Sequence, residues 1–559
     1  MNRSRAEKTL QRCGGGAAFL LSASLFVFAA LASWSAVAGA SPVTGRSAST
    51  ADHSRFPELQ GPFKSGEEVT EACLQCHTEA AKQVMATRHW TWDYVHPKTG
   101  QRLGKKHMIN GFCVGVATNE AYCTSCHAGY GWKDASFDFS SEKNVDCLVC
   151  HDTTGTYKKP SGLAGHPAYV RTEYPPGSGK FFEPVDLAFV AKHVGEPKRD
   201  NCGSCHYYGG GADGVKHGDL DSSLNAPSRE LDVHMAKDGL NFTCTTCHET
   251  QQHVVPGSRV AMTAVDAHPP QMRGKEEGRN PATCQSCHGD HPHPGGTGGL
   301  LGAVSKADQL NAHTRTLACQ TCHIPAFARG GVPTKMQWDY STAGQLDEKG
   351  KPIVRTDASG HVIYDSRKGD FVLGENVIPE YRWFDGTVSY TLPHDRIDPS
   401  KPVPINVYHG TPGARDSRIW PVKVFHGNQP YDKVNQTLLI PHLAIPDETA
   451  YWYNFDWEKA LRAGAEGGGP PYSGSFGFVR TEMLWPITHM VAPKEKALAC
   501  ADCHKEGGRL GGVPGVWLPG QDRHPLLERI GFGLAGFTFV GVLGHAALRF
   551  AVRKKRKAK

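Results

Sequence analysis

One short pattern, Cys-x-x-Cys-His, occurs eight times and takes up sixteen of the 18 cysteines in this 559-residue chain. The motifs are Cys73, Cys76 and His77; Cys123, Cys126 and His127; Cys147, Cys150 and His151; Cys202, Cys205 and His206; Cys244, Cys247 and His248; Cys284, Cys287 and His288; Cys319, Cys322 and His323; and Cys500, Cys503 and His504. Two such thiols can add to the vinyl groups of a haem while the adjacent histidine ligates the iron, which makes the pattern an attachment signature of c-type haem. Zinc knuckles do not need the histidine, and a disulfide framework would not repeat one local spacing. The sequence therefore predicts eight covalently bound haem c groups.

The eight motif histidines leave 21 of the 29 histidines as a pool for second axial ligands. An iron held by two imidazoles suits electron transfer, because the ligand set favours a six-coordinate, low-potential state. Candidate second ligands are His89, His193, His217, His234, His253, His291, His293, His313 and His489. No spacing rule assigns any of them to a particular motif, so their pairing stays open.

The stretch from the second motif to the residues after the third is different, because the 23 residues between His127 and His151 contain no histidine. Two lysines, Lys158 and Lys159, follow the third motif instead. A lysine amine can ligate iron once it loses its proton, and a nearby ferric ion lowers its pKa. The alternative is a solvated pair of lysines in a turn.

Cys113 lies outside every motif, ten residues before Cys123. A free thiol is unusual in an oxidising compartment, where it is exposed to oxidation and stray pairing. Beside a haem it could handle sulfur substrates. The alternative is a small, buried apolar residue.

Both ends of the chain carry apolar segments. Residues 1–40 combine a basic start, an apolar run and an A-x-A-like site at Ala38 and Ala40, which predicts a cleaved signal peptide, with retention as an anchor as the alternative. Residues 526–550 predict a transmembrane helix, since its nineteen-residue apolar run from Ile530 to Leu548 spans about 28 Å as a helix. The basic residues 551–559 then predict a cytoplasmic tail. We expect a single-pass inner-membrane protein with its body in the periplasm.

The remaining chain is predicted to fold around its haems. Gly and Pro are abundant, at 63 and 37 residues, and few regular apolar periods occur, which predicts a multihaem cytochrome c of mainly loops and short α-helices. We expect a flexible segment at 41–67, a catalytic body at 68–505 with a small, haem-free β-hairpin region at about 335–480, and a linker at 506–525. The exported body is net negative, because the chain's formal charge of +6 comes from its two ends. No nucleic-acid partner is therefore expected.

The stretches "YCTSCHAGYGWKD", "VDCLVCHDTTGTYKK", "ACQTCHIPAFARGG" and "PEYRWFDGT" together resemble the octahaem tetrathionate reductase family over about residues 68–505. The resemblance implies seven haems with two histidine ligands each and one active-site haem with a lysine ligand. It favours Lys158 or Lys159 on the haem of Cys123 and Cys126, with Cys113 as an active-site neighbour. The C-terminal apolar segment lies outside the resemblance, which suggests electron exchange with a membrane quinol-oxidising subunit or a cytochrome donor.

The function expected from this resemblance is anaerobic respiratory reduction of tetrathionate to thiosulfate. Reduction of nitrite or hydroxylamine to ammonia is a related possibility, although the Cys-x-x-Cys-Lys motif typical of ammonia-forming nitrite reductases does not occur in the sequence. Candidate positive groups for an anionic sulfur or nitrogen substrate are Lys105, Lys106 and Lys133. The alternatives are a non-catalytic electron conduit and a hydroxylamine-oxidoreductase-like enzyme.

Overall fold

The computed structural model describes residues 51–112, 114–257, 282–289, 291–295, 305–519 and 521–557. The chain divides into Met1–Asp52, of which only residues 51 and 52 are described, and His53–Lys559. The predicted signal peptide with Ala38 and Ala40, and the predicted thiol site at Cys113, lie outside the described residues. All that follows concerns the second unit.

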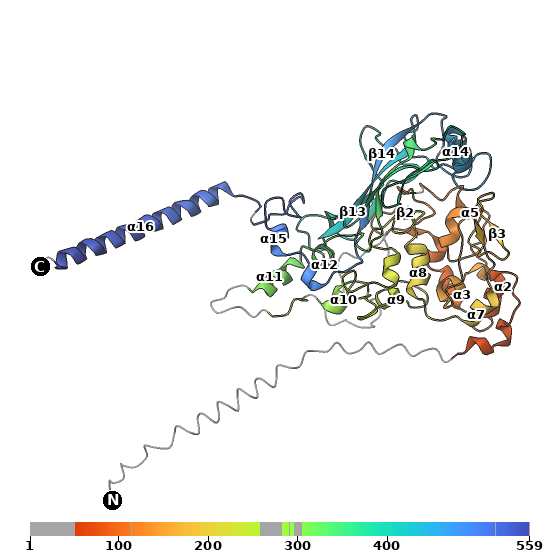
Figure 1. Ribbon diagram of the computed structural model, residues 1–559, viewed down its shortest axis with the longest axis horizontal. Coiled ribbons are helices and arrows are strands. Elements are labelled where there is room, and N and C mark those ends of the chain that lie inside the picture. The colour runs from red at the N-terminus through yellow and green to blue at the C-terminus, as the bar shows by residue number, and fades with distance from the viewer. Residues whose placement is uncertain are drawn as a thin grey trace, which may run out of the picture. The chain divides into compact units, whose positions relative to one another are not determined.

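Most helices of this unit are one or two turns long (Figure 1). They are α2 (Gly66–Leu74), α3 (Ala80–Met85), α4 (Arg88–Thr91), α5 (Glu120–Cys123), α6 (Leu148–His151), α7 (Leu187–Lys192), α8 (Arg199–His206), α9 (Cys244–Cys247), α10 (Gln285–His288), α11 (Lys306–His313), α12 (Cys319–His323), α13 (Tyr451–Asn454), α14 (Trp457–Glu466) and α15 (Cys500–Cys503). Side chains cap several of them. Ser305 Oγ accepts from Asp308 N at the start of α11, and Asp186 Oδ1 accepts from Phe189 N at the start of α7.

An eight-stranded mixed sheet occupies much of the chain between the seventh and eighth motifs. Its strands are β5 (Thr334–Asp339), β6 (Val354–Thr356), β7 (Val362–Asp365), β8 (Gly369–Gly374), β9 (Glu380–Phe384), β11 (Val403–Pro404), β13 (Arg418–Asp432) and β14 (Phe476–Pro486). The order is β11-β14-β13-β5-β8-β7-β6, and β9 pairs with β13 beside this path. The antiparallel pair β13–β14 runs in unbroken register from Val422 opposite Pro486 to Asp432 opposite Phe476. Short pairs elsewhere are β1 (Tyr94–Val95) with β2 (Arg102–Leu103), β3 (Thr172–Glu173) with β4 (Phe181–Phe182), and β10 (Val388–Tyr390) with β12 (Asn406–Tyr408).

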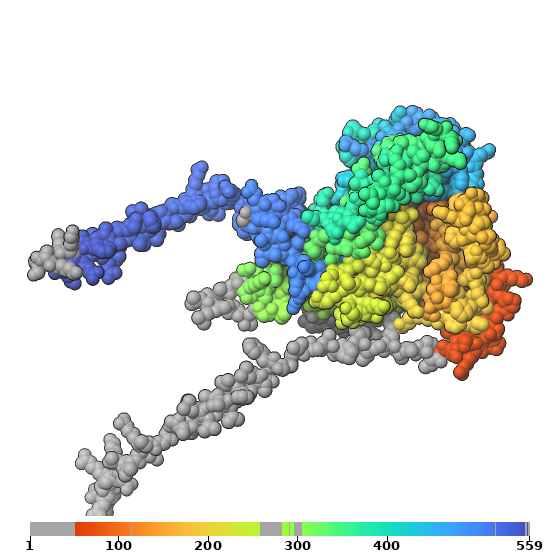
Figure 2. Space-filling view, viewed as in Figure 1, coloured from red at the N-terminus to blue at the C-terminus, as the bar shows by residue number. Residues whose placement is uncertain are grey.

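The main apolar core joins this sheet to the loops of the first half of the chain. The ring of Phe112 lies 4.2 Å from that of Phe425 on β13 and 5.7 Å from that of Trp485 on β14. Gly111 permits this contact, since a Cβ there would lie 2.7 Å from the Phe425 ring. Figure 2 shows the corresponding surfaces, with the green-to-blue sheet region adjoining the yellow and orange motif region. The haem-motif loops therefore pack against this sheet.

One polar group is also held at this junction. Lys423 on β13 is fully buried, and its Nζ donates to the carbonyls of Val215 and Lys216 and to the Thr334 hydroxyl at 3.0, 3.1 and 2.6 Å. Burial lowers the pKa of this ammonium well below its ordinary value. These bonds tie the loop around Val215 to the sheet.

Three parts of the chain are more ordered than the sequence suggests. The segment predicted to be flexible contains two 3-10 turns, His53–Arg55 and Pro57–Leu59, and Leu59 is buried. The region predicted as small hairpins belongs to the large sheet, because distant segments such as β5 and β13 pair in parallel. The predicted linker at 506–525 packs on the body, with Leu510, Val513 and Leu518 buried. In each case the contacts are long-range and leave no local pattern in the sequence.

The final helix, α16 (Pro525–Lys557), is long and apolar enough between Pro525 and Arg553 to cross a membrane, by length and composition. The described residues along this span are almost all exposed. A helix of this composition buried in no protein core fits a lipid environment.

The aromatic junction gives a stability prediction. Phe425→Ala should lower the free energy of unfolding by about 3–5 kcal/mol, because it deletes a fully buried ring from the contact between sheet and motif loops. Thermal unfolding of the holoprotein, followed by circular dichroism, measures this change. Val372→Ala, at a position 52% exposed on β8, is the matched control. Equal melting temperatures for the two variants would contradict the assignment of this junction as the core.

Candidate haem centres and active site

The motif cysteines are arranged as haem attachment requires. The two thiols of each motif are three residues apart, and most motifs lie on a helical turn, so both sulfur atoms face the same side. All sixteen motif cysteines are free of disulfide bonds. We number the sites one to eight in motif order.

Seven motif histidines each lie beside one histidine from outside the motifs. The pairs and the distances between their ring centres are His77–His53, 6.3 Å; His151–His253, 6.3 Å; His206–His89, 6.3 Å; His248–His489, 6.3 Å; His288–His234, 5.9 Å; His323–His293, 6.3 Å; and His504–His313, 6.2 Å. Each histidine occurs in one pair. The angle between the ring planes varies from 14° to 77°, whereas the distance scarcely changes.

A constant distance with a variable angle is what two axial ligands of one metal produce. Imidazoles on opposite sides of a metal, with metal–nitrogen bonds of about 2.0–2.1 Å, have ring centres about 6.3 Å apart. Rotation about the shared axis changes the angle and leaves the distance fixed. The donor sets at these seven sites therefore fit a haem with two histidine ligands.

In several of these histidines Nδ1 has a hydrogen-bond partner, so Nε2 would be the nitrogen that binds a haem iron. His151 Nδ1 contacts the Gly195 carbonyl at 2.9 Å, and His248 Nδ1 contacts the Pro256 carbonyl at 2.8 Å. Among the second ligands, His489 Nδ1 lies 3.2 Å from Asp219 Oδ2. Such partners fix the tautomer and the orientation of a metal-binding ring.

The histidine pairs show which of the second ligands predicted from the sequence lie beside a motif histidine and which do not. His89, His234, His253, His293, His313 and His489 all lie beside a motif histidine. By contrast, His193 is exposed and contacts the Phe189 carbonyl through Nδ1, His291 is exposed, and His217 packs on Trp485. His53 was missed, because it lies in the segment predicted to be flexible and no spacing marks it.

Contacts between motif cysteines give the order of the sites. Thiol contacts join Cys73 to Cys147, Cys202 to Cys244, and Cys284 to Cys319, so sites one and three, four and five, and six and seven are neighbours. Other cysteine pairs are close enough to interact electrostatically: Cys150 with Cys202 links site three to four, Cys247 with Cys287 links five to six, and Cys322 with Cys503 links seven to eight. Cys126 of site two contacts Cys205 of site four. The sites thus run one-three-four-five-six-seven-eight, and site two branches from site four.

The motif histidine of site two, His127, has different surroundings from the other seven motif histidines. Among the described residues, His127 is the one motif histidine whose ring lies beside no second histidine. Its Nε2 contacts the Trp90 carbonyl at 2.7 Å, and its Nδ1 is buried without a hydrogen-bond partner. The rings of Trp92 and Trp132 lie 5.4 and 4.9 Å from it. Burial lowers the pKa of this imidazole to about 3, so the ring is neutral at physiological pH.

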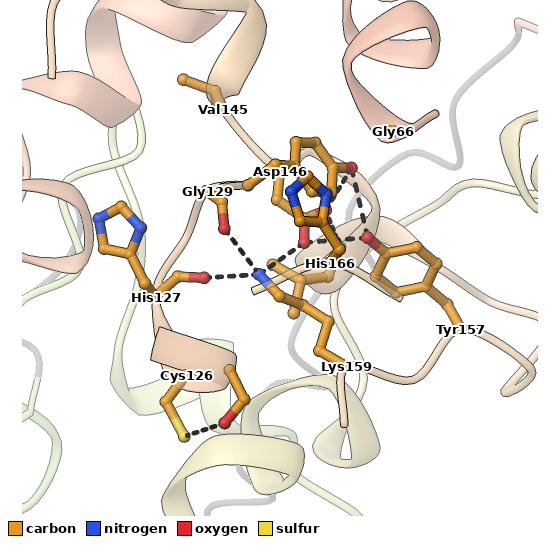
Figure 3. A network of polar contacts seen from close by, with 12 residues as sticks. Gly66, Cys126, His127, Gly129, Val145, Asp146, Tyr157, Lys159 and His166 are labelled. Carbon is orange, nitrogen blue, oxygen red and sulfur yellow. Dashed lines mark hydrogen bonds and ion pairs between the residues drawn. The ribbon is translucent and has the colours of Figure 1, made fainter. Parts of the chain in front are cut away.

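Lys159 lies at the same motif (Figure 3). Its side chain is 3% exposed, and its Nζ donates to the carbonyls of His127 and Gly129 at 2.7 and 3.1 Å. The same Nζ forms an ion pair of 2.9 Å with Asp146 Oδ2, whose side chain is fully buried. Figure 3 shows the His127 carbonyl facing this lysine and the His127 imidazole on the far side. Of the two lysines singled out in the sequence, Lys159 is held at site two, whereas Lys158 is exposed.

Asp146 is held by further donors from its surroundings. Tyr130 donates to Oδ1 at 2.8 Å, Tyr157 donates to Oδ2 at 3.0 Å, and the Val149 amide donates to Oδ1. Burial, and after it the Asp146 charge, raise the pKa of both phenols well above the ordinary value. The phenols therefore remain donors, and the carboxylate keeps hydrogen bonds other than those from Lys159.

Two other lysines place positive charge near site two. Lys105 Nζ lies 4.4 Å from the centre of the Trp92 ring, and Lys106 Nζ lies 4.2 Å from that of Phe139. Both charges help to lower the His127 pKa. Lys133, the third predicted positive group, is exposed. Cys113 lies outside the described residues, although its neighbours Phe112 and Val114 are buried.

Comparisons with known proteins agree with this arrangement. A family model described as bacterial cytochrome c matches residues 335–507. An uncharacterized protein of Archaeoglobus fulgidus is 26% identical over 243 residues, which are 36% of this chain and 79% of that protein. The crystal structure of octaheme cytochrome c from Shewanella oneidensis is similar with a TM-score of 0.70 and 40% identity, covering 84% of this chain and 100% of that one.

A chain with repeated haem-attachment motifs and paired axial histidines is a c-type cytochrome. Because it is 40% identical to the Shewanella protein and covers its whole length, the chain belongs to the octaheme cytochromes c. Its cofactor is covalently attached haem c, and the count of eight predicted from the motifs is that of the Shewanella protein. Its role is in redox chemistry.

The histidine pairs can be tested by exchanging a ligand. His89→Met should convert one haem to mixed histidine–methionine ligation and raise its reduction potential, because a thioether stabilises the reduced iron. Redox titration followed by optical and magnetic spectroscopy measures this. His193→Met should leave all potentials unchanged, since His193 lies beside no motif histidine among the described residues. The same spectra and potentials in both variants would refute the assignment for site four.

Proposed function

We propose that this cytochrome is a reductase whose catalytic centre is site two, and that its substrate is tetrathionate, which it reduces to thiosulfate. The observation that carries the proposal is the difference between this site and the other seven. Seven motif histidines have a second histidine at the spacing of axial ligands, whereas site two has a buried lysine beside the motif. A site without two fixed imidazoles suits substrate binding, and the paired sites suit electron relay.

Lys159 is the proposed amine ligand at site two. Its burial and its position on the backbone of His127 and Gly129 favour it over the exposed Lys158. Gly165 helps to form this position, since a Cβ there would lie 2.6 Å from the Gly129 carbonyl oxygen. The engagement of His127 Nε2 by the Trp90 carbonyl also favours an amine as ligand. Asp146 holds Lys159 near the motif. Its carboxylate would accept the proton when the lysine binds iron as a neutral amine, and it would stabilise the ammonium when the lysine stays charged.

The charge at site two favours an anionic substrate. Lys105, which is half-buried, and Lys106, which is exposed, supply positive charge beside the aromatic rings of this site, and such charge attracts an anion. Haem iron at this site would supply electrons and an exchangeable coordination position. Cleavage of the central S–S bond of tetrathionate takes up two electrons, forms two thiosulfate ions and needs no proton. Nitrite is also an anion, so it is the second substrate to consider, whereas hydroxylamine is neutral.

The proposed setting is the periplasmic face of the inner membrane. The apolar helix α16 and the basic residues that end it support an anchor with its C-terminus in the cytoplasm. Electrons would come from a membrane quinol-oxidising subunit or a cytochrome donor. The order of the sites supplies a route to site two through site four.

The role of Lys159 gives the first test. Lys159→Ala should abolish turnover and change the magnetic spectrum of one haem, because the amine ligand is lost. Lys159→Arg keeps the positive charge beside Asp146 but cannot ligate, so it should also be inactive. Lys158→Ala is the matched control and should behave as wild type. Full activity of Lys159→Arg would mean that the lysine serves only the ion pair, which would contradict the proposal.

The substrate gives the second test. With reduced methyl viologen as donor, we expect kcat/KM for tetrathionate to exceed that for nitrite and hydroxylamine by at least tenfold. Thiosulfate and ammonia assays identify the products. Higher kcat/KM for nitrite would reassign the substrate. No turnover with any of the three, together with spectra that cyanide does not change, would make the protein an electron conduit.

A further inference from the structure

The segment between α15 and α16 is a packed element of the body. We call residues 505–519 and 521–522 the C-terminal strap. Its residues Leu510, Val513 and Leu518 are buried against Tyr381 and Trp383 of β9 and Ile419 of β13. Burial of three apolar side chains removes their surface from water, so the hydrophobic effect holds the strap against the sheet.

Hydrogen bonds fix the strap at several points. Trp383 Nε1 donates to the Pro514 carbonyl at 2.8 Å, and Arg509 Nη1 donates to the carbonyl of Pro325, which follows the seventh motif. Near its end, the Leu518 amide donates to Asp522 Oδ2 at 2.6 Å. The strap therefore connects the surroundings of sites seven and eight to the sheet.

The strap also contacts the ligand set of site eight. His504 Nδ1 lies 3.0 Å from the Pro519 carbonyl, the same kind of contact that orients His151 and His248. Pro519 lines a cavity of about 450 Å³ together with His313, Cys500 and His504. These residues are the paired histidines and one attachment cysteine of site eight.

Chain length then limits how far site eight can be from α16. Pro525, the first residue of the helix, comes six positions after Pro519. A fully extended chain spans at most about 3.3–3.6 Å per residue, so this connection is no longer than about 20–22 Å. With α16 in a bilayer, site eight must lie near the membrane surface.

Site eight is also an end of the site order. Its motif contacts site seven through Cys322 and Cys503, and site seven leads on through Cys319 and Cys284 to site six. An electron that enters at site eight can therefore pass along the whole series to site four and its branch.

We propose that site eight is the port through which electrons enter from the membrane, and that the C-terminal strap fixes this port at the bilayer surface. The original donor is a hydroquinone confined to the bilayer, oxidised by the quinol-oxidising subunit of the proposed function. Its oxidation to the quinone releases two electrons, which enter site eight one at a time, and two protons, which go to water. This inference rests on the proposed membrane anchor and is independent of the substrate at site two.

Lengthening the connection tests the port. The holoprotein is reconstituted in phospholipid vesicles with an alkyl-chain ruthenium photosensitiser, which injects electrons from the bilayer after a flash. A twelve-residue Gly-Ser insertion between Arg523 and His524 should slow haem reduction by the anchored probe at least tenfold, because it lets the body move away. Reduction by soluble methyl viologen should not change. The same insertion between Glu348 and Lys349, in an exposed turn before β6, is the matched control.

A second variant identifies the site that receives the electron. His313→Met should raise the potential of site eight, so that the injected electron stays there and reduction of the other haems slows. If the other haems are reduced at the wild-type rate, electrons enter elsewhere and the port is refuted. Equal rates for both insertions refute the role of the strap, and failure of the protein to float with vesicles refutes the anchor and the port together. Turnover of the wild-type protein with methyl viologen does not need the membrane donor, so it tests the reductase separately.

Discussion

Axial ligation is the constraint on which the fold depends. Each haem must bring two side chains to opposite sides of one metal, and those side chains come from distant parts of the chain. His248 and His489 are 241 residues apart, and His206 and His89 are 117 apart. Closing such loops costs conformational entropy that grows slowly with loop length. Because metal bonds and thioethers close them, a chain rich in Gly and Pro can fold with few long helices. The large sheet then supplies most of the apolar core, because the motif loops contain few apolar side chains of their own.

Site two departs from this constraint, and the departure is local. His127 is surrounded by tryptophan rings, and its Nε2 contacts the Trp90 carbonyl. This nitrogen is therefore already engaged by a protein group. Lys159 is instead held by three oxygen atoms that belong to a carboxylate and two backbone carbonyls. An ammonium in such a position is stabilised by charge and hydrogen bonding while it stays close to the motif. The same elements that build the seven sites with paired histidines thus leave one site with a buried lysine in place of a second histidine.

The sequence predicted what is encoded locally. The eight motifs carry their own spacing, and the Lys158–Lys159 pair was visible because histidine is missing between the second and third motifs. Which lysine is buried could not be predicted, because that depends on Asp146, Tyr130 and Tyr157 meeting in space. His53 and the pairing of distal ligands were hidden for the same reason. The strap was predicted as a linker because its Gly and Pro content is typical of one, and its three buried apolar residues are too widely spaced to form a regular period.

The branch at site four has a consequence for timing. Sites three and one lie beyond the branch and are not on the path from site eight to site two. They form a side arm whose two irons can each hold one electron. In the proposed reaction, one-electron transfers along the sites would have to be matched to a substrate that takes up two electrons. A pair of reducing equivalents waiting on the side arm would let both reach site two in quick succession, so that a half-reduced sulfur radical need not persist there.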